Sequence, residues 1–454
     1  MTLSKEEKLL TTASIGHLYR KFGIPGIIGL LCMCFQPMID GLFLGNFVGP
    51  DALAGVNLFM PLYNFLSIAA VVMGIGCQTV ISISLGQSDY RRANNAFRTA
   101  FVFLLFFTAF MATLCVVGRN WLGTMLGADA TLMPHIVDYI LHFAPFLPAV
   151  VLIFLADYVL KSIGRPYAAM SMYGLVLLIN IVLDYLFIAK LGLGVSGAAR
   201  ATGLAFTVSC VLMFLSLLKE KNLVHIQKGK FDARLLRQML YNGSSEGLSE
   251  FSAGVTIFLF NWMMMKTFGA DGVAAFTAVN YILYLGVMLF VGLSDGIIPV
   301  FAYNYGAGNR DRLKKALFMG YKVNAVIGLI FFAILFFGSE GILELFFNDT
   351  SNEHVGHILS IAHIGASFMA FAFLFNGSNI ITSSFFTSMG DARRSVYISL
   401  LRGLLMVIIG IAIYPYVFGE NGIWLVIPIG EVVTFIYGRY LLHKKTPWVY
   451  RKLP

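Results

Sequence analysis

Charged residues are scarce in this chain. Only 12% of its 454 residues are Asp, Glu, Lys or Arg, whereas 58% are hydrophobic. A soluble domain of this length could not bury so much apolar surface. We therefore predict an all-α integral membrane protein.

Groups that carry out covalent chemistry are also few. The five cysteines lie in apolar segments without metal-ligand spacing, which is typical of core residues. The sequence contains no His-rich metal cluster, serine-nucleophile motif or GxxxxGK[ST] phosphate loop. These absences argue against an enzyme, an ATP-driven pump and a bound cofactor.

Long apolar stretches fill most of the chain. A bilayer core of about 30 Å needs roughly 20 apolar residues per helix. Twelve stretches meet this length, and we expect transmembrane helices at residues 22–46, 56–85, 97–118, 133–160, 168–190, 195–218, 243–267, 274–303, 316–338, 355–386, 395–418 and 421–442.

The basic residues fall mainly on one side of these spans. With the N-terminus in the cytoplasm, 28 of the 32 Lys and Arg residues lie in cytoplasmic segments or at cytoplasmic helix ends. This bias places both termini in the cytoplasm of a multi-pass protein of the cell inner (plasma) membrane. It also explains the net charge of +9 without a nucleic-acid partner.

Short motifs recur at an offset of 220 residues. The matched pairs are Gly49 and Gly269, Asp51 and Asp271, Gly86 and Gly306, and Arg92 and Arg312. Because each half has six spans, the halves have parallel topology and are expected to be related by a pseudo-two-fold axis along the membrane normal, as in many transporters.

The repeat sets the expected domain boundaries. We predict an N-lobe at residues 1–218, a cytoplasmic linker at 219–242 and a C-lobe at 243–454. The linker is basic and carries apolar positions among its charges, so we expect an amphipathic helix on the membrane surface.

Polar residues inside the N-lobe spans mark a candidate ion site. At a rise of 1.5 Å per residue, five polar residues on four spans lie at similar depths in the membrane: Asp40, Asp184, Asn180, Thr202 and Tyr139. Intramembrane carboxyl groups are costly and usually functional. These five groups could form a cage for H⁺, or for Na⁺ at Asp40, Asn180 and Asp184; the alternative is a structural hydrogen-bond network.

A proton bound by this cage could change the shape of a helix. A carboxyl group shielded from water takes up a proton more readily than an exposed one, and protonation rearranges its hydrogen bonds. The first span carries Pro25 and Pro37, which weaken its backbone hydrogen bonds. We expect these prolines to permit helix bending.

Two further carboxylates lie inside the C-lobe spans. Glu250 is in the inner part of the seventh span and Asp295 is in the inner half of the eighth. They could form a second cation site or line the substrate route.

Several sequence segments resemble a known family. They are IDGLFLGNFVGPDALAGV at 39–56, NIVLDYLFI at 180–188, GVSGAARAT at 194–202 and YNYGAGN at 303–309. Over essentially its full length the chain resembles the multidrug and toxic compound extrusion (MATE) transporters, in the branch of the DinF-like and MepA-like proteins.

The resemblance implies a monomeric, cation-coupled antiporter that exports cationic amphipathic compounds by alternating access between two lobes. Asp40, Asn180 and Asp184 match the family's N-lobe cation site, and Thr202 and Tyr139 match its auxiliary groups. The tenth span lacks the Asp that another branch of the family uses to bind Na⁺. We therefore favour H⁺ as the coupling ion, bound in the N-lobe, and keep Na⁺ as the alternative.

Other transporter classes fit less well. A lipid-linked precursor flippase has a related fold, but usually has a strongly cationic cavity, whereas the charges here are mostly acidic. A major facilitator would carry an Asp-Arg-x-Gly-Arg pattern that residues 88–95 lack.

Overall fold

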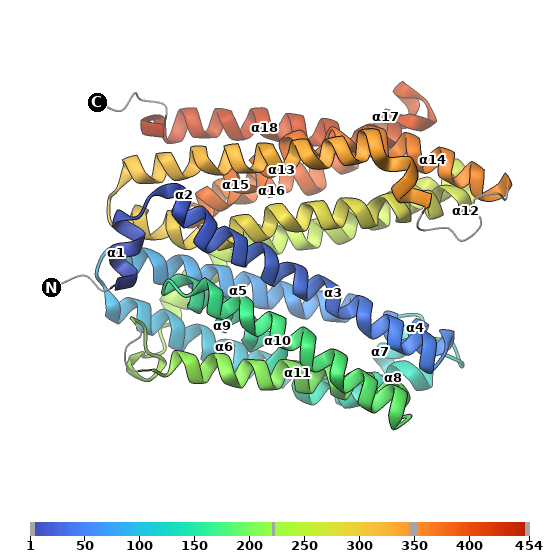
Figure 1. Ribbon diagram of the computed structural model, residues 1–454, viewed down its shortest axis with the longest axis horizontal. Coiled ribbons are helices and arrows are strands. Elements are labelled where there is room, and N and C mark those ends of the chain that lie inside the picture. The colour runs from blue at the N-terminus through green and yellow to red at the C-terminus, as the bar shows by residue number, and fades with distance from the viewer. Residues whose placement is uncertain (1–4, 220–222, 345–352, 450–454) are drawn as a thin grey trace. The chain divides into compact units, whose positions relative to one another are not determined.

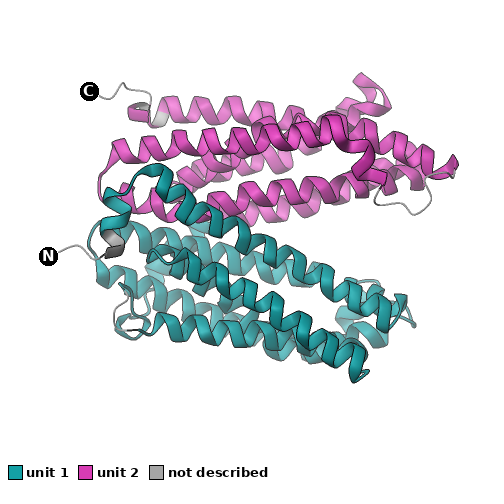
Figure 2. Ribbon diagram, in the orientation of Figure 1, with its two compact units in different colours: residues 1–243 teal, residues 244–454 magenta. Residues whose placement is uncertain are grey.

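A computed structural model describes residues 5–219, 223–344 and 353–449. Within these ranges the chain is helical and contains no strand. It divides into two compact units, Met1–Gly243 and Ser244–Pro454 (Figure 2). The all-α prediction is confirmed for the described residues.

The first unit is a bundle of long helices with short connecting ones (Figure 1). Its helices are α1 (Lys5–Thr12), α2 (Ile15–Leu18), α3 (Ile24–Phe47), α4 (Pro50–Asn57), α5 (Met60–Gly86), α6 (Tyr90–Val117), α7 (Arg119–Met125), α8 (Met133–Phe143), α9 (Leu147–Ser162), α10 (Pro166–Asp184) and α11 (Gly194–Leu217).

The second unit continues from α12 (Ala233–Gly306), within which the division between the units falls. Its other helices are α13 (Arg310–Glu344), α14 (Glu353–Ala370), α15 (Phe373–Ser388), α16 (Ala392–Leu400), α17 (Met406–Phe418) and α18 (Val426–Lys445).

Helix starts follow local sequence signals. Pro50 and Pro166 occupy the first turns of α4 and α10, where a missing N–H breaks no helical hydrogen bond. The Asp89 carboxylate accepts a hydrogen bond from the Arg92 backbone N–H at 2.9 Å and caps α6.

Glycine positions in the connections bear out the internal repeat. Gly49 and Gly269 have φ values of 126° and 66°, and Gly164 and Gly390 have 81° and 74°. Among the described residues, Ser88 is the non-glycine residue with a positive φ, 60°. Its repeat partner, Gly308, has a φ of 73°. Equivalent left-handed turns thus connect equivalent helices in the two units.

The number of membrane spans in the structure agrees with the twelve predicted from the sequence. Among the described residues, ten helices are long and apolar enough to cross a membrane, and the bent pair α14–α15 supplies one more. Helix α12 has 74 residues, roughly 110 Å at 1.5 Å per residue, which is far too long for one crossing. Non-helical backbone at Gly269 divides it into two spans, as the repeat requires.

The expected tenth span, 355–386, is not one straight helix. Helices α14 and α15 meet at an angle of 50°. At the break, the Phe371 and Ala372 N–H groups donate to residues three positions earlier, at 3.2 and 3.0 Å, so the backbone is tightened rather than left unpaired.

The expected linker helix also differs from the structure. Between residues 223 and 232, the structure shows one short 3₁₀ turn, Ile226–Lys228, instead of an amphipathic surface helix. The His225, Lys230 and Asp232 N–H groups donate to side chains of α6 at 2.7 to 2.9 Å. Hydrogen bonds to α6 therefore hold this segment in an irregular conformation.

Candidate functional site

Three helices of the first unit bring the predicted cage residues together. Helices α3, α10 and α11 pack against one another. Asp40 comes from α3, Asn180 and Asp184 come from α10, and Thr202 comes from α11. All four side chains are buried. Asn180 and Asp184 are four residues apart, so one face of α10 presents both.

Asp40 is the centre of a hydrogen-bonded cluster. Its Oδ2 accepts from the Thr202 hydroxyl at 2.9 Å and from the Gln36 amide at 2.5 Å. Gln36 and Asn180 each also place an amide nitrogen 3.3 Å from the Thr202 hydroxyl oxygen. Sequence reasoning missed Gln36, although its position one turn before Asp40 could have revealed it.

Asp184 supplies a second carboxyl group to the cluster. It is fully buried and lies within interaction range of Asp40. Both of its oxygens, together with Asp40 Oδ1 and Asn180 Oδ1, have no hydrogen-bond partner among the described residues. Two buried carboxylates without a basic partner are electrostatically costly, so a proton or small cation would stabilise the pair.

Tyr139 lies at the edge of this cluster. Its ring packs against Phe59 and Phe143, with centroid distances of 5.1 and 5.4 Å. It lies within range of electrostatic interaction with Asp40 and Asp184. Within the described residues its hydroxyl forms no hydrogen bond with the cage, so its observed contacts are mainly apolar.

The two prolines of the first span lie in different local backbone structures. Pro37 lies inside α3, and the helix continues beyond it to Phe47. Pro25 follows a π-helical turn at Tyr19–Gly23, which lengthens the local hydrogen-bond spacing where proline has no N–H. Both positions interrupt the regular ladder in one continuous span, Ile15–Phe47.

A second π-helical turn adjoins the cage. It spans Tyr185–Lys190 and begins immediately after Asp184. Such turns are local departures from α-helical geometry and are frequent at functional sites. The same helix thus carries both a buried carboxyl group and a non-standard turn next to it.

The cage offers oxygen ligands rather than a dedicated transition-metal centre. No group of three or more His, Cys, Asp or Glu side chains in the described ranges could hold a metal ion. A transported Na⁺ at Asp40 and Asp184 would therefore draw on oxygens of Asn180 and Thr202. A proton would need only the two carboxyl groups.

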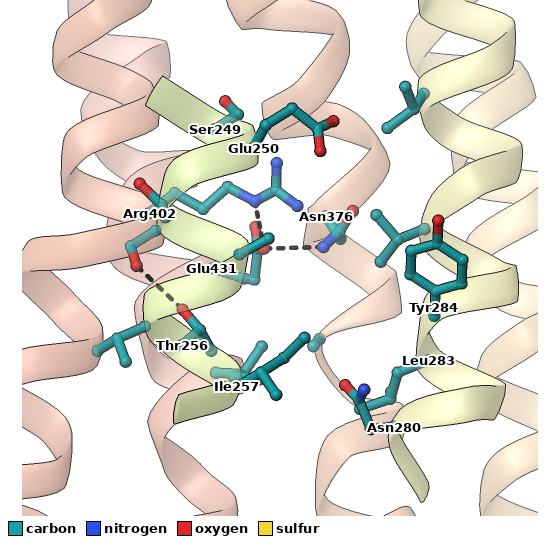
Figure 3. A pocket seen from close by; sticks show the side chains of 18 of the residues that line it. Ser249, Glu250, Thr256, Ile257, Asn280, Leu283, Tyr284, Asn376, Arg402 and Glu431 are labelled. Atoms are coloured by element: carbon teal, nitrogen blue, oxygen red, sulfur yellow. Dashed lines mark hydrogen bonds and ion pairs between the residues drawn. The ribbon is translucent and has the colours of Figure 1, made fainter. Parts of the chain in front are cut away.

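The second unit contains a cavity of about 220 Å³ (Figure 3). Glu250 is an exposed position of α12 and lines this cavity. The other predicted carboxylate, Asp295, is half-buried and is not among the lining residues. The structure therefore places Glu250 at the pocket wall, and both Glu250 and Asp295 lie within electrostatic range of Glu246.

Glu431 of α18 is the best-connected carboxylate of this pocket. Its Oε1 accepts from Asn376 at 2.8 Å and from Arg402 Nε at 2.7 Å, and its Oε2 accepts from Asn379 at 2.6 Å. Arg402 lies in a π-helical turn, Leu401–Leu405. The sequence showed Glu431 inside the last span, but nothing in it indicated which helices supply the partners.

The part of the chain that the structure describes has twelve apolar spans in two repeat-related units, with buried carboxyl groups inside them. These are the features of a multi-pass membrane transporter. The comparisons with known proteins agree. A family model described as MatE matches residues 25–186 and 250–412, one segment in each unit. This chain belongs to the MatE family, and it is a transporter rather than an enzyme.

Individual relatives cover nearly the whole chain. It is 25% identical over 452 residues to a FAD transporter of Shewanella oneidensis, with 97% of each chain covered. It is 22% identical over 445 residues to the multidrug export protein MepA of Staphylococcus haemolyticus, covering 97% of this chain and 96% of the relative.

A solved structure has the same fold. It is described as the outward-facing conformation of a multidrug resistance MATE family transporter of the MOP superfamily. It is 24% identical, covers 100% of both chains and gives a TM-score of 0.90. The family model and the MepA relative confirm the predicted resemblance to MATE transporters, and this structure shows the same fold.

Proposed function

We propose that this protein is a cation-coupled multidrug efflux antiporter of the plasma membrane. It exports cationic amphipathic compounds by alternating access, acts as a monomer with both termini in the cytoplasm, and uses H⁺ as its coupling ion in preference to Na⁺. It needs no bound cofactor. The relatives named MepA support multidrug export.

The observation that carries this proposal is the buried pair Asp40 and Asp184. Their carboxyl groups lie in an apolar helix bundle, and three of their four oxygens have no hydrogen-bond partner among the described residues. Binding a cation would relieve the charge, and releasing it would restore the charge. Such a site can couple ion movement to a change in helix packing.

Coupling requires that the ion alter a helix as well as a charge. Asp40 lies three residues after Pro37 in the first span, and Asp184 directly precedes a π-helical turn. Rearranged hydrogen bonds at these carboxyl groups therefore act on backbone that is already irregular. This supports helix bending as the response to proton binding.

The pocket of the second unit supports a separate substrate site. Its walls are mostly apolar, and Glu250 offers a carboxylate to a cationic group. An apolar cavity with a few placed polar groups is the usual form of a small-molecule site. Glu250 is thus proposed to bind the cationic end of the exported compound.

The test is export of ethidium from proteoliposomes that contain the purified protein. A pH gradient and a Na⁺ gradient are imposed separately. The proposal predicts movement driven by the pH gradient and loss of that movement in Asp184→Asn. Asp138→Asn, at a half-exposed acid of the same unit that pairs with His142 outside the cage, is the matched control.

Either gradient driving ethidium would name the coupling ion, and Na⁺ alone would overturn the preference for H⁺. Because one relative is a FAD transporter, FAD serves as a second probe. Folded protein that moves neither compound under either gradient would contradict coupled efflux and favour a lipid-linked precursor as substrate.

A further inference from the structure

Glu431 is poorly placed to bind a substrate cation, because it is buried and already paired. It is 3% exposed, and three side-chain donors occupy its two oxygens. Arg402 also balances its charge. The pair is therefore a neutral, hydrogen-bonded support at one side of the pocket rather than an open anionic site.

Arg402 has unused donors on the side away from Glu431. Only its Nε bonds to Glu431, and its terminal nitrogens have no partner among the described residues. Its side chain is 23% exposed and lines the cavity. In Figure 3 the guanidinium group points into the pocket, between the carboxyl groups of Glu431 and Glu250.

Glu250 supplies the opposite charge in the same cavity. Neither a hydrogen bond nor an ion pair joins it to Arg402 or to any other side chain in the described ranges. Apolar residues from several helices line the space around these groups: Ile257, Leu283, Val287, Phe373 and Ile427. The pocket thus presents an unpaired carboxylate and a guanidinium edge beside apolar walls.

We propose that Arg402 recognises an anionic group of the substrate, so that the pocket binds zwitterionic amphipaths that carry both a cationic amine and a carboxylate. Glu250 holds the amine and the free edge of Arg402 holds the carboxylate. This inference rests on the proposed efflux function and names the substrate class of its second-unit pocket.

Glu431 has a positioning role in this arrangement. Guanidinium is planar, with its donors in a fixed fork. Holding Nε against Glu431 fixes the plane and directs the terminal N–H groups into the cavity. A guanidinium fixed before the ligand arrives loses little freedom on binding, and it pairs well with a carboxylate.

Rhodamine 110 and rhodamine 123 test the proposal directly. Rhodamine 110 carries a carboxylate and a cationic ring system, and rhodamine 123 is its methyl ester, which is only cationic. Dye affinity is measured by fluorescence anisotropy on the purified full-length protein, and export of each dye is measured in proteoliposomes.

Arg402→Gln removes the charge but keeps a hydrogen-bonding side chain. It should weaken rhodamine 110 binding by about tenfold or more, since one charge-assisted interaction is lost. Rhodamine 123 binding should stay the same or tighten, because a nearby positive charge is removed. Arg310→Gln, at an exposed arginine outside the pocket, should change neither.

The double variant Arg402→Gln with Glu431→Gln separates recognition from folding. It removes the buried charge together with its partner, so no unpaired carboxylate is left in the span. The proposal predicts a folded protein that binds rhodamine 123 and still fails to bind rhodamine 110 well. Recovery of rhodamine 110 binding would show that Arg402 acts only structurally and would overturn the proposal.

The remaining outcomes are also distinct. Wild-type protein that exports rhodamine 123 but does not bind rhodamine 110 would overturn the zwitterion proposal and leave cation-coupled efflux standing. Equal weakening of both dyes by Arg402→Gln would overturn it as well. Wild-type protein that moves neither dye nor ethidium would reject the efflux function, and this proposal with it.

Discussion

The two units place buried carboxylates inside their helix bundles and neutralise them differently. In the second unit, Glu431 has Arg402 as a permanent counter-ion and Asn376 and Asn379 as donors. In the first unit, Asp40 and Asp184 have amide and hydroxyl neighbours but no ion-pair partner in the described residues. A permanent counter-ion gives a fixed structure, whereas its absence leaves the charge to a mobile cation.

The contrast assigns different tasks to similar side chains. The first unit can gain and lose a cation because nothing in the described structure already neutralises it. The second unit keeps its Glu431 pair intact and leaves Glu250 and the guanidinium edge for a ligand. The predictions below test this division, from the largest expected effect to the smallest.

The largest effect is expected for Asp40→Asn and Asp184→Asn. Each removes the titratable charge but keeps a polar side chain of similar size. Gradient-driven ethidium export should fall to the level of protein-free liposomes, while the melting temperature stays near that of the wild type. Near-normal export at matched protein content would contradict the first-unit assignment.

Glu431→Gln should instead act mainly on stability. It leaves Arg402 without its counter-ion, and breaking a buried pair in this way costs about 3 kcal/mol. Thermal unfolding in detergent, followed by circular dichroism, should shift to lower temperature. Glu340→Gln, at an exposed position of α13, is the control and should leave the transition unchanged.

An intermediate effect is expected for Gln36→Ala. It deletes the amide that bonds to both Asp40 and Thr202, and the loss of one such hydrogen bond is worth about 1 kcal/mol. The rate of pH-driven export should fall severalfold without being abolished. A rate equal to wild type would show that Gln36 does not order the cage.

The smallest effect is expected for Tyr139→Phe. The substitution keeps the ring contacts with Phe59 and Phe143 and removes only the hydroxyl, which has no hydrogen bond to the cage in the described structure. Export rate and ion dependence should match the wild type. A loss comparable to that of Asp184→Asn would return Tyr139 to the cation site.

Periodic features of the sequence predicted much of this structure. Hydropathy located the spans, and the offset of 220 residues paired Gly49 with Gly269, both of which adopt positive φ. The spacing of Asn180 and Asp184 placed them on one helical face, and similar depths indicated that Asp40 and Thr202 would meet them. These features depend on local geometry, which the sequence encodes directly.

Features that depend on tertiary packing were harder to predict. The 50° break before α15 has no proline to announce it, and hydrogen bonds to α6 determine the path of residues 223–232. Glu431 acquires its role from Arg402 on a different helix, so its position in the last span was visible while its partner was not.

The division of tasks between the units is the central claim, and ethidium affinity tests it most directly. The dissociation constant is measured by fluorescence anisotropy for purified Asp184→Asn and Glu250→Gln proteins. The account predicts near wild-type affinity for Asp184→Asn and an increase of about tenfold in the dissociation constant for Glu250→Gln, which loses a charge-assisted contact. Weakened binding in Asp184→Asn together with unchanged binding in Glu250→Gln would place the substrate in the first unit and contradict the account.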